Sequence, residues 1–357
     1  MKRFLSLILC ICMLVTVFSL QVFAADETTA QDPHEVTRKY TTAFNKQLTK
    51  GDITGDGKVT TEDASEYLKV AAKLSAPKEN VNYDFNEDTQ VTTDDARKAL
   101  RVAAGLEPAV SDEVIFNYFL DEVNSVKETF PGFKRTATGT CKSARITVSG
   151  APILLGINCK DKEYVDFIRE NEALFRDNSK PEEYDEMLKQ AEELYIPRSE
   201  DKVINAGSNL HYTNYPVSTL GVSCKLDFED IEDIKFESKD GKYIITVTLG
   251  DYTYGSKNPY PGAYSQHAER VKLPYGKVFN LIEFSEEDAQ KLQEVALRDG
   301  KVVLTVDSTT GEIINSDYLF KVKTTVKDVS EAGVYKIEMI TKMDYEFREY
   351  FDMTTKA

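Results

Sequence analysis

Apolar residues follow two different patterns along the chain, and the change between them divides it into regions. Over Pro33–Leu48 they recur every three or four positions, which is the spacing of one helix face. The same spacing returns over Ser111–Phe130, Glu163–Asp177 and Pro181–Leu194. From Tyr243 onwards, apolar and polar residues mostly alternate, as in strands with one buried face. The pattern therefore predicts helices first and a sheet afterwards.

The alternating region contains the signals of antiparallel hairpins. Asp240-Gly241 separates two strand patterns and suits a two-residue turn. Alternating runs also flank Gly311, and the last run keeps one parity over Tyr335–Phe347. A further helix is expected over Ser285–Gly300, because Ser-Glu-Glu-Asp forms a capping box and glycine is a common helix stop. We therefore expect residues 110–357 to be an α+β domain in which helices cover an antiparallel meander sheet.

Residues 51–108 contain one pattern twice, 32 residues apart. Gly51–Leu74 and Tyr83–Leu106 are identical at 12 of 24 positions. Ca²⁺ takes oxygen ligands from loop positions 1, 3, 5, 7, 9 and 12. At those positions the first copy has Asp52, Thr54, Asp56, the carbonyl of Lys58, Thr60 and Asp63, and the second has Asp84, Asn86, Asp88, the carbonyl of Gln90, Thr92 and Asp95. Three carboxylates in each loop would repel one another without a cation, so we expect one calcium ion per loop.

The two loops are not equivalent. Gly57 at position 6 tolerates a positive φ, whereas Thr89 takes the same place in the second loop at a cost in strain. Thr54 at position 3 is a poorer ligand than Asn86. We therefore expect calcium in both loops with unequal affinity. An acidic helix pair without metal, or a calcium module without a partner, are the alternatives.

A short helix with a small apolar stripe is expected after each loop. The predicted stripes are Ala64, Leu68, Ala71 and Ala72 in one helix, and Ala96, Leu100, Ala103 and Ala104 in the other. Such stripes let two short helices pack closely. Val59 and Val91 are expected to pair across the loops. Pro77, between the repeats, disfavours a helix that enters the second loop.

These repeats resemble the dockerin family, the small calcium-folded modules that bind cohesin domains of scaffold proteins in anaerobic fibre-degrading bacteria. The resemblance covers about Gly51–Pro108 and lies in two loops that close on Asp, each followed by an Ala/Leu helix. It implies a small all-α module with calcium as its cofactor and a cohesin as its partner. The implied partner contacts are Thr61, Glu62 and Lys69 in one repeat, and Thr93, Asp94 and Arg101 in the other. Their symmetry implies binding in either of two orientations.

The chain start indicates export. Residues 1–24 have the pattern of a secretory signal, with Lys2 and Arg3 before an apolar run and a small-residue cleavage site. Residues 25–50 are then a short helical linker. Loss of Lys2 and Arg3 takes the formal charge from −16 to −18. A surface this acidic repels nucleic acid and anionic membrane, so we exclude both as partners and expect a secreted, extracellular protein.

The large domain shows few chemical signals. It has no nucleophile elbow, no phosphate loop and no tryptophan for stacking on sugars. Three cysteines remain in the exported chain, and an odd number cannot pair completely. A bridge between Cys141 and Cys159 on neighbouring strands is one reading. The resemblance implies an anaerobic habitat and favours instead three buried thiols, with Cys224 as the third.

A loop rich in Gly and Pro carries several tyrosines, and it is either a ligand platform or a segment packed on the core. The residues in question are Tyr212, Tyr215, Tyr252, Tyr254, Tyr260, Tyr264 and His267. We expect residues 110–357 to be a non-catalytic module that binds polysaccharide or a cell surface, or that has a structural role. The alternative is a carbohydrate-active hydrolase of plant polysaccharide. In both cases the resemblance implies a component of a cellulosome-like complex that acts in extracellular polysaccharide breakdown.

Overall fold

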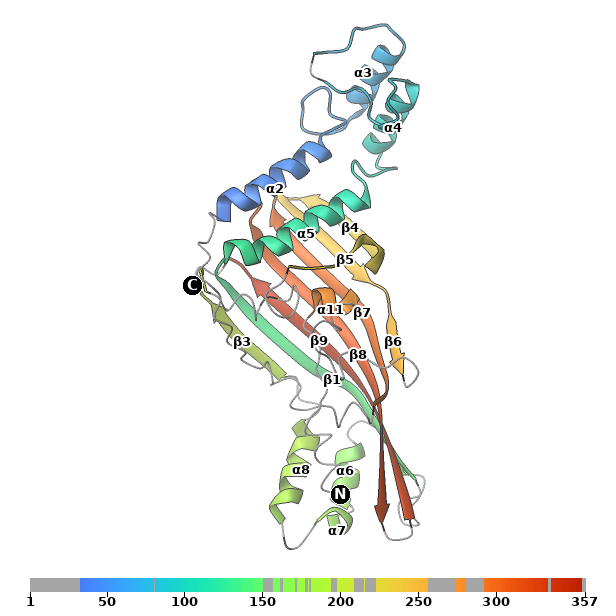
Figure 1. Ribbon diagram of the computed structural model, residues 1–357, viewed down its shortest axis with the longest axis vertical. Helices are drawn as coiled ribbons and strands as arrows, with labels where there is room; N and C mark the ends of the chain where they lie inside the picture. The colour runs from blue at the N-terminus through green and yellow to red at the C-terminus, as the bar shows by residue number, and fades with distance from the viewer. Residues whose placement is uncertain are drawn as a thin grey trace.

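The described residues form an α+β structure with one large antiparallel sheet (Figure 1). This computed structural model describes residues 33–79, 81–149, 157–160, 163–170, 172–176, 179, 181–193, 198–208, 215, 223–255, 274–279, 292–332 and 335–354. The predicted fold class is confirmed at the level of helices combined with an antiparallel sheet. None of the helices in these ranges is long and apolar enough to cross a membrane.

Nine strands make up the sheet in the described part of the chain. The neighbours run in the order β2-β1-β9-β8-β7-β5-β4, with β3 beside β1 and β6 beside β7. The strands are β1 Phe133–Ser149, β2 Ile157–Lys160, β3 Arg198–Ile204, β4 Ile231–Lys239, β5 Lys242–Leu249, β6 Tyr252–Gly255, β7 Leu292–Asp307, β8 Ile313–Ala332 and β9 Tyr335–Asp352. Three hairpins, β4–β5, β7–β8 and β8–β9, follow chain order, as the alternating pattern predicts.

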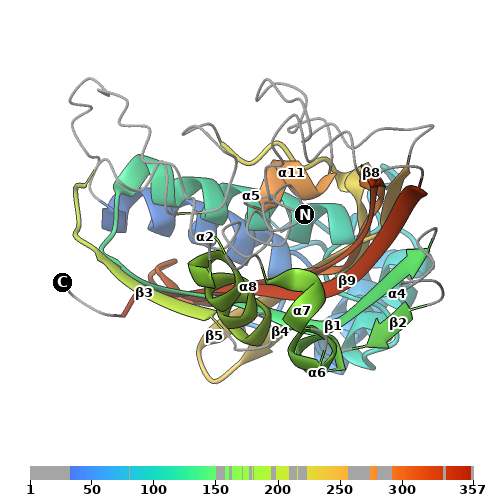
Figure 2. The same ribbon diagram turned by 90° about the horizontal axis from the view of Figure 1, so that it is seen from below.

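The helices also follow the sequence pattern for the most part. Ser111 caps the N-terminus of α5, and the predicted stretch Glu163–Asp177 contains two helices, α6 and α7. The helices are α2 Pro33–Leu48, α3 Thr61–Ala71, α4 Thr93–Ala103, α5 Asp112–Thr129, α6 Glu163–Glu170, α7 Glu172–Phe175, α8 Pro181–Glu193 and α11 Pro274–Val278. Figure 2 shows α2, α5 and α11 on one face of the curved sheet.

The predicted helix over Ser285–Gly300 is wrong where the structure describes it. Leu292–Gly300 belongs to β7 and pairs with β6 and β8. Val295 and Leu297 are buried there, whereas Glu294 is exposed. Hydrogen bonding to two neighbouring strands overrides the local helical signal, because strand preference depends on tertiary context. Residues 280–291 lie outside the described ranges.

Helix α2 packs tightly on the domain that contains the sheet, the described residues of 110–357, which we call the sheet domain. Phe44 stacks on Tyr118 of α5 with ring centroids 4.1 Å apart, and it joins the same buried core as strands β5 and β7. At the turn between β7 and β8, a Cβ on Gly311 would lie 2.4 Å from the Thr37 carbonyl oxygen. Gly311 also has φ +78°. Only glycine therefore meets both conditions at the point where α2 approaches this turn.

A carboxyl group is buried in the interface between α2 and α5. Glu122 is fully buried, and its Oε1 accepts a hydrogen bond of 3.2 Å from Thr41 Oγ1. None of the described residues forms a hydrogen bond with its Oε2. Burial raises the pKa of Glu122 to about 8, although hydrogen bonds from Thr41 and Tyr118 oppose the rise. The side chain is therefore mostly neutral at pH 7.

We expect Gly311→Ala to lower the free energy of unfolding by about 2–3 kcal/mol, because the methyl group adds a close contact with α2 to the cost of a left-handed residue. Gly241→Ala is the matched control, since Gly241 has φ +72° in a hairpin turn with open space around it. The control should lose about 1 kcal/mol. Urea denaturation measures both, and equal losses would contradict the tight seating of α2.

We expect the stability contributed by Glu122 to be complete below pH 4.5 and to be lost as the pH rises towards 8, its pKa in the folded state. Between these values the folded protein binds more protons than the unfolded chain, so the free energy of unfolding falls with pH. Relative to Glu122→Gln, the fall should amount to about 3–5 kcal/mol. Urea denaturation from pH 4 to pH 9 measures it. Glu113→Gln, an exposed change on the same helix, should leave the slope unchanged.

Candidate metal centre

The two repeats form a small module at one end of the molecule, beyond α2 and α5 (Figure 1). Helices α3 and α4 pack against each other around a separate core, whose buried members are Ile53, Ala64, Tyr67, Val70, Tyr83, Phe85, Ala96 and Ala99. Because residues 32 positions apart fill similar places in this core, the module has an approximate two-fold repeat.

The predicted packing stripe of the helices is partly wrong. Ala64 and Ala96 are buried as expected, but Leu68 is 49 % exposed and Leu100 is 51 % exposed. Tyr67 and Ala99, each one position earlier, are fully buried instead. The aromatic ring of Tyr67 stacks on Phe85 of the second loop, which turns α3 so that Leu68 faces outwards. The predicted pairing of Val59 with Val91 is not supported, since Val91 is also exposed.

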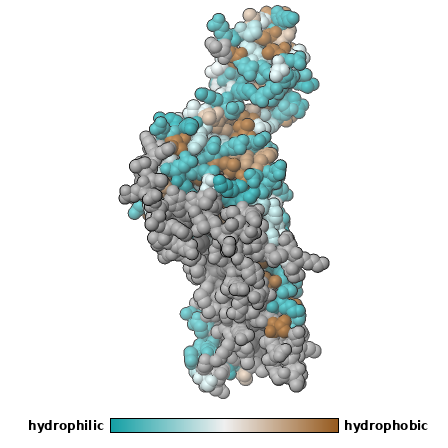
Figure 3. Space-filling model, viewed as in Figure 1, coloured by the Kyte–Doolittle hydropathy of each residue, from teal (hydrophilic) through white to brown (hydrophobic). Residues whose placement is uncertain are grey.

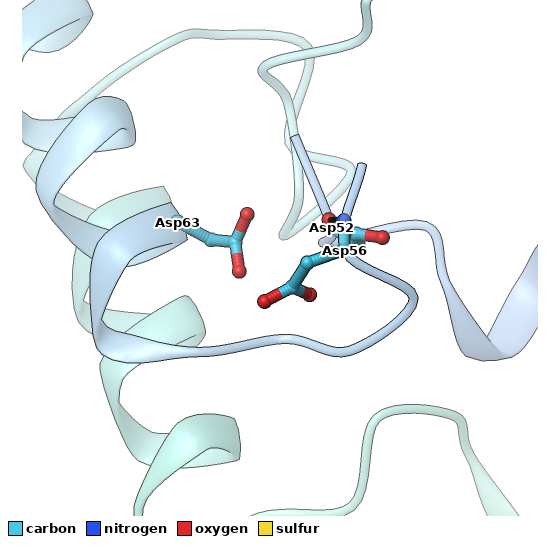
Figure 4. A group of neighbouring side chains, drawn as sticks. All are labelled: Asp52, Asp56 and Asp63. Atoms are coloured by element: carbon cyan, nitrogen blue, oxygen red, sulfur yellow. Dashed lines mark hydrogen bonds between the residues drawn. The ribbon is translucent and has the colours of Figure 1, made fainter. Parts of the chain in front are cut away.

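The first loop gathers three carboxylates. One oxygen atom each from Asp52, Asp56 and Asp63 lies within 4.8 Å of the others. Figure 4 shows Asp63, on the first turn of α3, directing its carboxylate towards that of Asp56 in the loop. Among the described residues this is the one such group of acidic, histidine or cysteine side chains. Oxygen atoms at this spacing fit a hard divalent cation such as Ca²⁺.

Asp63 holds the first loop together as well as facing the carboxylate group. Its side chain is fully buried, and its Oδ1 accepts hydrogen bonds from the backbone N–H groups of Ile53 (2.9 Å) and Thr54 (2.8 Å). Its Oδ2 accepts from the Thr60 N–H at 2.7 Å and from the Thr60 hydroxyl at 2.8 Å. Burial alone would raise the pKa of Asp63, but the hydrogen bonds from Thr60 and Thr54 outweigh it and lower the pKa.

Asp52 shapes the other end of the first loop. Its Oδ2 accepts a hydrogen bond from the Gly57 N–H at 2.6 Å, and its Oδ1 accepts from the Gly55 and Asp56 N–H groups. The Thr54 hydroxyl donates to Asp52 Oδ1 at 3.2 Å. These bonds fold the loop back over its first carboxylate. Three backbone N–H groups and one hydroxyl group therefore converge on the Asp52 carboxylate.

The second loop repeats five of these hydrogen bonds at equivalent positions. Asp95 Oδ1 accepts from the Phe85 and Asn86 N–H groups at 2.8 and 3.0 Å, and its Oδ2 accepts from the Thr92 N–H at 2.8 Å. Asp84 Oδ2 accepts from the Thr89 N–H at 2.9 Å. The same backbone geometry therefore arises twice from two sequences that differ at half their positions.

The loops differ at position 6, as the sequence predicts. Gly57 has φ +90° and Thr89 has φ +71°. A left-handed conformation is unfavourable for a residue with a branched β-carbon such as threonine, so the second loop is strained where the first is not. The loops also differ at position 3, where the side-chain amide of Asn86 donates a hydrogen bond of 3.0 Å to Asp88 Oδ2.

The remaining predicted ligands also lie in the loops. The Lys58 N–H donates to Asp56 Oδ1 at 2.9 Å, and the Gln90 N–H donates to Asp88 Oδ1 at 2.8 Å. Thr60 and Thr92 are the N-caps of α3 and α4. The capping role of these two threonines was missed at the level of sequence, although Thr-x-x-Asp is a recognisable capping pattern.

The six predicted partner contacts lie on the surface in equivalent pairs. Thr61 and Glu62 are exposed on the first turn of α3, and Thr93 and Asp94 are exposed on the first turn of α4. Lys69 and Arg101 are half exposed in the last turn of each helix. Figure 3 shows apolar patches on the module, and the exposed large apolar residues of these repeats are Leu68, Leu74, Val91, Leu100 and Leu106.

Two lysines bind the backbone of the two loops at equivalent positions. The sequence analysis did not predict either contact. Lys78 Nζ donates to the Ile53 carbonyl at 2.9 Å, and Lys98 Nζ donates to the Phe85 carbonyl at 3.0 Å. Each ammonium group therefore binds the carbonyl at position 2 of one loop. No local sequence signal marks them, because Lys78 lies between the repeats and Lys98 lies within α4.

The candidate residues of the large domain are mainly buried. Tyr215 and Tyr254 pack in the core, while Tyr212, Tyr260, Tyr264 and His267 lie outside the described residues. Cys141 and Cys224 are buried thiols, as predicted. Cys141 lies opposite Tyr345 of β9, whereas Cys159 lies opposite Ile146, so the two cysteines are not neighbours in register.

The chain matches no family model, and comparison with the curated proteins and with the solved structures found no match. The residues and geometry of the module are therefore the basis of the function proposed below.

We expect Thr89→Gly to stabilise the module by about 1 kcal/mol and to tighten calcium binding at the second loop by roughly fivefold, because it relieves a left-handed threonine. The reciprocal change, Gly57→Thr, should weaken the first loop by a similar factor. Isothermal titration calorimetry of calcium measures both variants. Unchanged binding in both variants would show that position 6 does not control affinity.

Proposed function

We propose that this chain is a secreted component of a scaffold-based, cellulosome-like complex and that it binds a cohesin domain through a calcium-dependent dockerin module. The observation that carries the proposal is the repetition of one loop geometry, with Asp63 and Asp95 accepting equivalent backbone hydrogen bonds. Two loops built around such carboxylates suit two Ca²⁺ ions, and in the first loop the ion would neutralise the clustered negative charge. Asp52, Asp56 and Asp63 would hold the first ion.

The exposed pairs on α3 and α4 support the proposed mode of binding. Thr61 and Glu62 occupy on one helix the places that Thr93 and Asp94 occupy on the other. A partner that recognises one pair would meet equivalent chemistry after a half-turn of the module. We therefore propose that a cohesin binds in either of two orientations, with Lys69 or Arg101 adding a positive charge at the edge.

For the sheet domain we propose a non-catalytic binding or structural role in polysaccharide breakdown outside the cell. Tyr215 and Tyr254, which were candidates for a ligand platform, contribute their rings to the core. In the interior, the Tyr215 hydroxyl forms hydrogen bonds of 3.3 Å with the hydroxyl groups of Ser316 and Tyr318. These contacts favour packing as the role of the described tyrosines.

We expect replacement of Thr61, Glu62, Thr93 and Asp94 together by alanine to abolish binding to a panel of cohesin domains, while either pair alone binds in the remaining orientation. Biolayer interferometry in calcium, and again in excess EDTA, measures the binding. EDTA should also abolish it, because metal binding and folding are linked in small modules.

Alanine at Glu232 and Asp233, exposed on β4, is the control for loss of negative charge and should bind as the unchanged protein does. Binding that survives EDTA, or no binding to any cohesin in calcium, would contradict the proposed function. Complete loss from one pair alone would contradict the two orientations.

A further inference from the structure

The first calcium loop follows directly from a helix that belongs to the sheet domain. Helix α2 ends at Leu48, and the first ligand position is Asp52. The Asp52 N–H donates to the Thr49 carbonyl at 2.9 Å, and the Thr49 N–H donates to the Asn45 carbonyl at 3.0 Å. The Thr49 hydroxyl also donates to the Asn45 carbonyl at 2.9 Å. A continuous run of hydrogen bonds therefore joins the last turn of α2 to the loop.

The side chain of Asn45 is held by the sheet domain. Its Oδ1 accepts a hydrogen bond of 2.6 Å from the Tyr243 hydroxyl on β5. Its Nδ2 donates to the Ser308 carbonyl at 3.2 Å, in the turn after β7. Ser308 itself donates through N–H and Oγ to the carbonyl of Gly241, so both hairpin turns meet at this point. Asn45 is thus fixed to the sheet through its side chain and to the loop through its backbone.

The beginning of the first loop is also fixed to the second loop. A Cβ on Gly51 would lie 2.5 Å from Cζ of Phe85, so the backbone passes directly against that ring. Lys50 forms an ion pair with Glu87, at position 4 of the second loop. The segment between Asn45 and Asp52 therefore has the sheet domain on one side and both loops on the other.

Resting on the calcium binding proposed above, we propose that Asn45 is a positioning residue that couples cation binding in the first loop to the seating of α2 on the sheet domain. A cation would order Asp52 and, through Thr49, the last turn of α2. The sheet domain, through Tyr243 and Ser308, holds that turn in the position from which the loop starts. Coupling of this kind is reciprocal, so calcium stabilises α2 on the sheet and the sheet tightens calcium binding.

Hydrogen exchange of the full exported chain, with calcium and with EDTA, tests the coupling. We expect calcium to slow exchange of the amides of residues 52–63 and also of Asn45–Thr49 in the last turn of α2. If Asn45 has only a structural role, the Asn45→Ala variant will show the same calcium-dependent difference at α2 as the unchanged protein.

The variant Tyr243→Phe removes one hydrogen bond to Asn45 and keeps the ring that packs on Phe44. It should weaken calcium binding at the first loop by roughly threefold to tenfold and reduce the calcium effect on α2 exchange. Asn45→Ala should have the same effect or a larger one. Tyr252→Phe, a hydroxyl removal on β6, is the matched control and should bind calcium as the unchanged protein does.

The outcomes separate the coupling from the proposed function. If calcium slows exchange in residues 52–63 but leaves α2 unchanged, and Tyr243→Phe and Asn45→Ala bind calcium normally, the coupling is wrong while the calcium module stands. If calcium changes exchange nowhere and binds with no measurable heat, both ideas fail. Slowed exchange at α2 that both variants diminish would support the coupling.

Discussion

The close seating of α2 on the sheet domain is the contact on which the arrangement of the whole molecule depends. Gly311 leaves room for the Thr37 carbonyl, and Phe44 fills the core between α5 and the sheet. Asn45 forms hydrogen bonds with Tyr243 of β5 and with Ser308 in the turn after β7. Since α2 runs into the first loop and α5 follows the second repeat, the small module is attached to the sheet domain at both of its ends. It is an insertion between two packed helices.

Within the module, the organising element is a buried aspartate at the end of each loop. Asp63 and Asp95 accept the backbone donors that bring the start of each loop to the start of the following helix. A carboxylate in this place accepts hydrogen bonds from N–H groups that would otherwise lack partners. The cations proposed for the loops would bind beside these carboxylates.

The sheet domain has a different chemical character. Its described interior is rich in pairs of aromatic rings. The ring centroids of Tyr215 and Phe351 are 5.0 Å apart, and those of Phe279 and Phe320 are 4.9 Å apart. Its outer face carries ion pairs such as Arg348 with Asp317, at 2.8 Å. Packing of this kind suits a platform that carries the small module of the two repeats. Glu122 is buried beneath α2, where burial raises the pKa of its carboxyl group.

The sequence by itself determined the local elements. Asp240-Gly241 specified a hairpin turn, and Ser111 specified the start of α5. The repeated aspartates specified the two loops. Each of these features depends only on residues that are close together in the chain. Tertiary structure alone decided the rest. Leu292–Gly300 is a strand because β6 and β8 pair with it. Leu68 is exposed because the ring of Tyr67 stacks on Phe85 and takes the buried place in the module. The hydrogen bonds that attach α2 to the sheet join Asn45 to Tyr243 and Ser308, which are about 200 or more positions away in the chain. A local sequence pattern cannot predict such a contact.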